Sequence, residues 1–173
     1  MKHPLDTNYF ALFHLPVQFP LDGEILNTRY RELQRVIHPD RYAHASDQEK
    51  RLAQQHATLI NDAYHTLRDD LKRAQYLLRL KGVSLEQRQV HDPGFLMEQM
   101  ELREELAAIE QARDPARFDT LFKQIRQLEK NCKQALQESF ATPERLEQAC
   151  EAVVKLQFIR KLAEEAESLE ERL

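Results

Sequence analysis

The chain has 173 residues, of which 42% are hydrophobic and 31% are charged, enough for one domain or two small ones with buried cores. Its three glycines cannot form a GxGxxG or Walker-type loop, which excludes the usual nucleotide-binding motifs. Residues 1–81 carry 12 Lys and Arg against 10 Asp and Glu, whereas residues 82–173 carry 13 against 19. Neither half has the dense basic stripe of a nucleic-acid-binding protein.

The first half of the chain begins with two predicted helices that prolines delimit. The apolar stretch TNYFALFHL, residues 7–15, predicts a short helix that Pro16 stops. Asp22 can cap a second helix, which should end near His38 because a residue before proline disfavours helical backbone angles. The apolar residues of this second helix recur at helical spacing: Leu26, Tyr30, Leu33 and Ile37.

Two more helices are predicted before Gly82. The third begins with Ser46 and Glu49, which have the spacing of a capping box. The fourth is short and covers residues 71–80. The third helix should turn one face toward the core, formed by Leu52, His56, Leu59, Ile60, Ala63 and Leu67.

The second half of the chain predicts a linker and three long helices. Residues 82–92 have no sustained period and are interpreted as the linker. Each following helix opens at a proline: Asp92-Pro93, Asp114-Pro115 and Thr142-Pro143. In the latter two pairs, the residue before the proline is expected to cap the helix, and the missing N–H of a proline at the first helical position costs little. No segment shows sustained two-residue alternation. We therefore expect an all-α protein with an N-terminal helical domain over 1–81 and a three-helix bundle over 93–173.

The stretch RVIHPDRYA interrupts the helical pattern between the second and third helices. Arg31 and Arg35 share one helical face that leads to His38, so they form a basic strip that can steer an acidic partner. Asp40 offers an acceptor for a partner arginine, and Pro39 stiffens the bend. The alternative is an ordinary turn.

The helix after Pro93 has more apolar residues than one buried stripe needs. Leu96, Met97 and Met100 lie outside the stripe of this helix that is expected to be buried. In the last helix, Val154 and Phe158 point away from the expected core residues. These residues predict an exposed apolar patch rimmed by glutamates, a typical protein interaction site. Alternatively, Leu96, Met97, Met100 and Phe158 pack against the linker or the N-terminal domain.

These features together resemble a known family. The helix order and the His-Pro-Asp bend resemble a J domain over roughly residues 7–80. The remaining motifs are similar to HscB, the J-domain co-chaperone family of iron–sulfur cluster assembly. They are INDAYHTL (60–67), RAQYLL (73–78), FLMEQMELREELAAIE (95–110) and VKLQFIRKL (154–162).

The resemblance implies two partners and no catalysis by this chain. One partner is an HscA-type chaperone of seventy kilodaltons, whose ATPase would be stimulated by contacts with Arg31, Arg35, His38, Pro39, Asp40 and Arg41. The other is an IscU-type scaffold protein, which would bind Leu96, Met97, Met100, Glu101, Glu104 and Phe158. Ile37 and Arg41 differ from the residues common in the family at these positions, but Ile37 keeps the apolar character and Arg41 keeps the charge. Ala108 replaces a common acidic residue, which puts one electrostatic contact in doubt.

Other functions remain as alternatives. The chain could be a generic J-domain co-chaperone, a helical adaptor without a role in cluster assembly, or an enzyme using His38 and Asp40. No metal or cofactor is predicted, because no histidine has the spacing of a metal site and His56 is expected to be a hydrogen-bonded core residue. The distant Cys132 and Cys150 are predicted to be buried thiols.

The cellular location is predicted from missing targeting signals. No apolar run approaches the roughly 18 residues of a transmembrane helix, so no membrane contact is expected. The first ten residues lack the apolar stretch of a signal peptide. We therefore expect a cytoplasmic protein.

Overall fold

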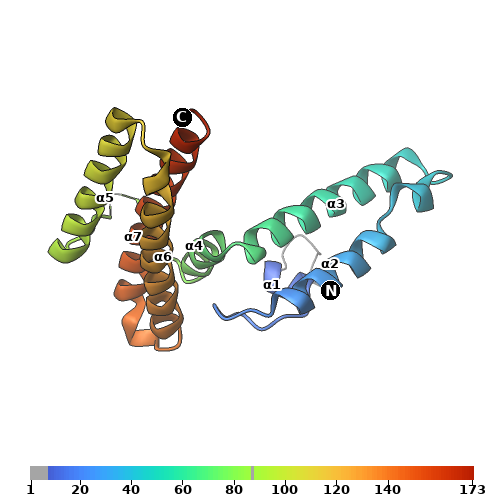
Figure 1. Ribbon diagram of the computed structural model, residues 1–173. Coiled ribbons are helices and arrows are strands. Elements are labelled where there is room, and N and C mark those ends of the chain that lie inside the picture. Colours follow the sequence, from blue (N-terminus) through green and yellow to red (C-terminus); the bar gives the residue numbers. More distant parts are fainter. Residues whose placement is uncertain (1–7, 87) are drawn as a thin grey trace. The chain divides into compact units, whose positions relative to one another are not determined.

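The computed structural model describes residues 8–86 and 88–173, and no strand occurs in these ranges (Figure 1). The predicted all-α fold is confirmed. The chain divides into two compact units, one before residue 81 and one from residue 81 onward.

The described residues of the first unit form four α-helices, as expected. They are α1 (Tyr9–Leu12), α2 (Gly23–Val36), α3 (Asp47–Arg68) and α4 (Asp70–Leu80), and a 3-10 turn, Pro39–Tyr42, lies between α2 and α3. Asp22 caps α2 by accepting from the amides of Glu24 and Ile25. Ser46 and Glu49 form the predicted capping box at the start of α3.

The core of the first unit forms around α3, which contacts the other three helices. Tyr9 of α1 stacks on Tyr76 of α4 with ring centroids 4.5 Å apart, and its amide donates to the Tyr76 hydroxyl at 2.9 Å. The largest side chains that are fully buried in this unit are Phe10, Phe13, Leu26, Leu67 and Leu78. The short α1 is therefore fixed by aromatic packing despite having only one turn.

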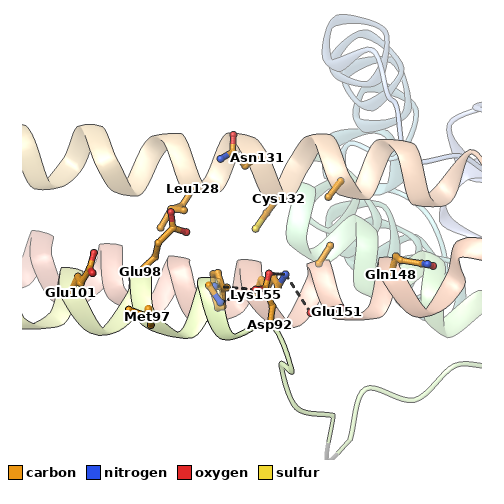
Figure 2. Close-up of a pocket in the computed structure, with 14 residues that line it drawn as sticks. Asp92, Met97, Glu98, Glu101, Leu128, Asn131, Cys132, Gln148, Glu151 and Lys155 are labelled. Atoms are coloured by element: carbon orange, nitrogen blue, oxygen red, sulfur yellow. Dashed lines mark hydrogen bonds and ion pairs between the residues drawn. The ribbon is translucent and has the colours of Figure 1, made fainter.

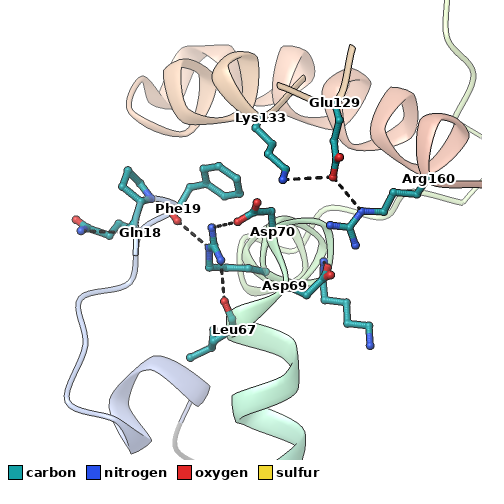
Figure 3. Close-up of polar contacts among 11 residues, drawn as sticks. Gln18, Phe19, Leu67, Asp69, Asp70, Glu129, Lys133 and Arg160 are labelled. Atoms are coloured by element: carbon teal, nitrogen blue, oxygen red, sulfur yellow. Dashed lines mark hydrogen bonds and ion pairs between the residues drawn. The ribbon is translucent and has the colours of Figure 1, made fainter. Parts of the chain in front are cut away.

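A buried arginine joins α4 to the segment before α2. Arg73 is 6% exposed and donates to the carbonyl oxygens of Phe19 at 2.8 Å and Leu67 at 2.7 Å. Its third bond goes to the Asp70 carboxylate at 2.6 Å (Figure 3). The guanidinium also lies 4.7 Å from the centre of the Phe19 ring. The charge is thus buried together with its acceptors, as a buried charge must be.

Two residues of the predicted inward face of α3 differ from expectation. Leu52 is 45% exposed, because the hydrogen-bonded pair of Tyr30 and Asn61 sets a register in which α2 ends before reaching it. The half-buried His56 has an Nε2 atom with no hydrogen-bond partner among the described residues. The expectation of a hydrogen-bonded core histidine at this position is wrong.

The second unit contains three long helices, α5 (Pro93–Ala112), α6 (Phe118–Phe140) and α7 (Leu146–Glu170). Asp92 caps α5 by accepting from the amides of Gly94 and Phe95. The other two predicted prolines each begin a 3-10 turn, Pro115–Arg117 and Pro143–Arg145, which leads directly into the α-helix. These two α-helices therefore start three residues later than their prolines. Asp114 caps the first turn by accepting from the Ala116 amide, whereas the side chain of Thr142 makes no capping bond, so the cap predicted there is wrong.

The bundle core comes mainly from α6 and α7, which pack against each other along their length. The helix α5 adds three buried residues to this pair, Phe95, Leu102 and Ile109. The largest fully buried side chains of the pair are Phe118, Leu121, Leu136, Leu156, Val153 and Cys150. Consequently, α5 covers the pair with one face only and leaves its other faces available.

The segment predicted to be a linker, residues 82–92, is counted with the second unit where it is described. Arg88 forms an ion pair with Glu147 at 2.5 Å, and Val90 is buried. Its role as a linker, and the domain limits of 1–81 and 93–173, stay predictions.

Candidate functional site

The His-Pro-Asp bend forms a compact turn beyond the end of α2. The Nδ1 atom of His38 lies 3.3 Å from the Asp40 amide nitrogen and 3.4 Å from the Asp40 carboxylate. A neutral imidazole accepts from the amide, whereas a protonated one donates to the carboxylate, so the same nitrogen serves one contact at a time. The Asp40 side chain is 91% exposed. The bend therefore presents a carboxylate to the solvent from a locally bonded turn.

The predicted basic strip lies beside this bend. Arg31, Arg35 and His38 line one hollow of about 380 Å³ between α2 and α3. The other residues of its lining are Gln34, Ile37, Ala57 and Asn61. Arg41 is exposed and, like Asp40, is outside this lining. The structure thus brings three of the predicted chaperone-binding residues around one hollow.

An aromatic seam, consisting of Tyr30, Tyr64 and the amides around them, holds α2 against α3. The two rings stack with centroids 3.9 Å apart. The Tyr30 hydroxyl donates to Asn61 at 2.9 Å and the Tyr64 hydroxyl to Asn27 at 2.7 Å. Gln34 donates to the Tyr30 hydroxyl at 2.6 Å. Sequence reasoning missed the seam, although Asn27, Tyr30 and Gln34 have helical spacing.

The predicted scaffold-binding residues of α5 are exposed. Leu96, Met97 and Met100 are 37%, 63% and 59% exposed, and Phe158 of α7 is 39% exposed. Glu101 and Glu104 are also exposed, and among the described residues neither forms an ion pair. We call these six residues the apolar face: Leu96, Met97, Met100, Glu101, Glu104 and Phe158.

Val154 was also expected in this exposed patch, and that expectation is wrong. It is only 6% exposed. Residues of the segment before α5, Arg88, Gln89 and His91, line the same hollow as Val154. The sequence shows no period in this segment, which was interpreted only as a linker, so its packing on this side of α7 was not predicted.

Ion pairs hold α5 on α7. Lys155 contacts Asp92 at 2.7 Å and Glu151 at 3.3 Å, and Arg103 contacts Glu165 at 2.8 Å. The hydrogen bond from Lys155, aided by the amide of Phe95, lowers the pKa of Asp92. Burial disfavours the charge on Lys155, but its two carboxylate partners raise its pKa. Lys155, which holds the start of α5 on α7 through Asp92, thus lies three positions before Phe158.

The described residues offer no cluster of three or more His, Cys, Asp or Glu side chains that could hold a metal ion. Cys132 and Cys150 are buried, as predicted. Burial raises the pKa of Cys132 to about 11, so its thiol is protonated near neutral pH. Within the same described ranges, no helix is both long and apolar enough to cross a membrane.

Two family models match the chain. A DnaJ domain matches residues 8–76, which include the bend, and an HSCB C-terminal oligomerisation domain matches residues 91–167, which include the apolar face. The curated co-chaperone protein HscB homolog of Vibrio cholerae serotype O1 (strain M66-2) is 45% identical over 172 residues. That alignment covers 96% of this chain and 98% of the relative.

Solved structures agree with this assignment. Chaperone HscB from Vibrio cholerae matches with a TM-score of 0.83 at 44% identity, covering 96% of this chain and 99% of that one. Human co-chaperone protein HscB matches with a TM-score of 0.89 at 31% identity, covering 99% and 86%. The order of a J domain and an HscB-type helical domain is therefore confirmed, and the chain belongs to the HscB family of J-domain co-chaperones.

Proposed function

We propose that the protein delivers an IscU-type iron–sulfur cluster scaffold to an HscA-type chaperone and stimulates the ATPase of that chaperone. The observation that carries the proposal is the presence of two exposed surfaces of different chemistry on two separate units of one chain. One is the bend with its basic strip, and the other is the apolar face. The cytoplasmic location expected from the sequence belongs to the same proposal.

The first unit would dock on the chaperone through charge. Arg31, Arg35 and Arg41 are exposed and can steer an acidic surface toward the bend. Asp40 can then accept a charge-assisted hydrogen bond from a partner arginine. Because the bend is already closed by contacts between His38 and Asp40, little further ordering is needed on binding. ATP hydrolysis takes place in the partner, and this chain supplies contacts only.

The second unit would hold the scaffold through the apolar face. Methionine side chains adapt to different partner shapes, and Met97 and Met100 are the most exposed large apolar residues of α5. The unpaired Glu101 and Glu104 would add attraction for basic side chains of the scaffold. Linking the two units in one chain raises the effective concentration of the scaffold at the chaperone.

The ATPase part of the proposal can be tested by steady-state ATP turnover of the chaperone. The His38→Gln variant should lose most of the stimulation, because the imidazole closes the bend. The control is His65→Gln, which changes an exposed histidine of α3 in the same unit. Equal stimulation by wild type and His38→Gln would show that the bend is not the activating element.

The scaffold part can be tested by calorimetric titration. A triple variant, Leu96→Ala, Met97→Ala and Phe158→Ala, should lose on the order of 2 kcal/mol or more of binding free energy if these residues are anchors. A control variant truncates two exposed apolar side chains of the first unit, Ile25→Ala and Leu52→Ala. Unchanged scaffold affinity in the triple variant would favour a generic co-chaperone or an adaptor without a role in cluster assembly.

A further inference from the structure

The apolar face continues into a groove between α5 and α6. Two hollows, of about 680 Å³ and 530 Å³, share four lining residues, which makes them one continuous depression. The shared residues are Glu98, Glu101, Leu128 and Asn131. Figure 2 shows Glu98 and Leu128 pointing toward each other from the two helices. We call this depression the α5–α6 groove.

The smaller hollow lies on the flank of α5 that faces α6, whereas the larger hollow is also lined by residues of α7, namely Gln148, Glu151, Ala152 and Lys155. The ion pair between Arg103 and Glu165 marks the flank of α5 that faces α7, which carries Phe158. The ion pair between Glu105 and Arg117 marks the opposite flank, toward the start of α6. Glu105 also lines the groove. A partner that covers the exposed side of α5 therefore reaches Phe158 on one flank and the smaller hollow on the other.

The groove and the apolar face share residues. Met97 and Glu101 belong to the apolar face and also line the larger hollow. On α6, the lining residues run from Thr120 to Ala135, a length of about 22 Å at the rise of an α-helix. That length suits a short helix or an extended segment of a partner.

Within the part of the chain that the structure describes, ion pairs do not balance the charge of the groove. Glu105 is paired with Arg117, and Lys155, the only basic side chain among the described lining residues, is paired with Asp92. Glu98 and Glu101 have no ion-pair partner among the described residues. The groove thus combines an apolar floor around Leu128 with one edge of uncompensated carboxylates.

We propose that the α5–α6 groove extends the scaffold-binding surface and takes a segment of the scaffold protein with an apolar side chain between basic ones. The apolar side chain would contact Leu128 and Met97, and lysine or arginine side chains would pair with Glu98 and Glu101. This inference rests on the proposed binding of the scaffold. It adds α6 to the interface and states the chemistry of the bound segment.

The test is calorimetric titration of the full-length protein with the scaffold at low and at high salt. The groove variant combines Glu98→Gln with Gln127→Lys, which removes one carboxylate and adds a positive charge to the lining. Its affinity should fall roughly tenfold at low salt, and the loss should shrink at high salt because screening weakens charge contacts. The matched control, Gln137→Lys, adds the same charge to α6 at an exposed position outside the groove and should bind like wild type.

The outcomes separate this inference from the proposed function. Wild-type affinity in the groove variant, together with lost binding in the triple variant of the apolar face, would overturn the groove and leave the proposed function standing. Unchanged affinity in both would overturn both. Analytical ultracentrifugation of the protein alone provides a further check. If the wild type forms a dimer and the groove variant is a monomer, the groove is occupied by a second copy of this chain, and the inference is overturned. Matching circular dichroism spectra should show that the variants fold.

Discussion

The two units differ in how they support the surfaces they expose. In the first, the aromatic seam fixes α2 against α3, and the bend lies beyond the end of α2. In the second, ion pairs hold α5, which carries most of the apolar face, against α7. Stacked rings and neutral hydrogen bonds are insensitive to salt, whereas partly exposed ion pairs weaken as salt rises. The position of the apolar face should therefore respond more strongly to salt concentration than that of the bend does.

The two surfaces also differ in the sign of their charge. Arg31 and Arg35 make the first surface basic, and the unpaired Glu101 and Glu104 make the second acidic. A partner attracted to one surface is repelled by the other, which favours correct pairing when two partners are present. The comparison can be tested by disturbing each unit separately.

The largest effect is expected from Arg73→Met, which should disrupt the first unit alone. The substitution removes three hydrogen bonds, two of which go from the buried guanidinium to the main-chain carbonyls of Phe19 and Leu67. We expect a loss of about 3 kcal/mol in the unfolding free energy of this unit. Urea unfolding followed by circular dichroism should show one transition shifted and the transition of the second unit unchanged.

A control on the same helix is Arg79→Met. Arg79 is exposed and lies 5.1 Å from the centre of the Tyr76 ring, a contact that contributes less than about 1 kcal/mol. Equal effects of the two substitutions would contradict the importance of the buried hydrogen bonds of Arg73.

A smaller effect is expected from Tyr30→Leu, which breaks the aromatic seam. The variant loses the stack on Tyr64 and the bond to Asn61, at a cost of about 2 kcal/mol. Because α2 is then held less firmly, stimulation of the chaperone ATPase should also fall. Tyr30→Phe keeps the ring and should recover most of this stimulation, while still costing about 1 kcal/mol in urea unfolding. Full stimulation by Tyr30→Leu would mean that the seam does not support the docking surface.

Local rules in the sequence predicted most of the helices. Asp22, Ser46 and Asp92 have the chemistry of N-caps, and each caps a helix in the structure. The bend was recognisable because His-Pro-Asp interrupts a helical pattern. The apolar face was predicted from Leu96, Met97 and Met100, which exceed the needs of one buried stripe, and their exposure agrees with that reasoning.

Contacts between distant segments could not be predicted in the same way. Arg73 bonds to Phe19, which lies 54 residues earlier, and no local pattern specifies that pair. Val154 is buried beside a segment that has no helical period. Leu52 is exposed because the lengths and register of α2 and α3 decide what covers it. Periodicity gives the face of a residue, but not the element that lies against that face.

A smaller effect than that of Arg73→Met or Tyr30→Leu is expected from Lys155→Met, which should change how the stability of the second unit depends on acidic pH. The pKa of Asp92 is lowered in the folded state, mainly by the hydrogen bond from Lys155. The ionised Asp92 therefore stabilises the folded unit at pH values above its unfolded pKa of about 4, and this stabilisation is lost as the pH falls through the lower pKa of the folded state. The variant should therefore lose stability less steeply between about pH 5 and pH 2 than wild type does. Urea unfolding at a series of pH values measures this slope, and an identical slope would show that Lys155 does not govern Asp92.

The smallest effect is expected from Ala108→Glu, which adds a carboxylate to the acidic side of α5. Position 108 is four residues after Glu104, so it lies one turn further along the same side of α5, where Ala108 is half-buried. The added charge should strengthen scaffold binding two- to threefold at low salt, as expected for one rim charge. Repulsion from Glu104 should cost about 0.3 kcal/mol of stability, too little to disturb the helix.

The control for this substitution is Gln137→Glu, which adds the same charge to an exposed position of α6 away from the groove. If both substitutions raise affinity equally, the gain comes from net charge and steering of the scaffold toward the whole unit. If only Ala108→Glu raises it, the carboxylate acts at the interface, and α5 then binds by local charge pairing as well as by apolar contact. High salt separates the two effects further, because long-range steering is screened more strongly than a close pair.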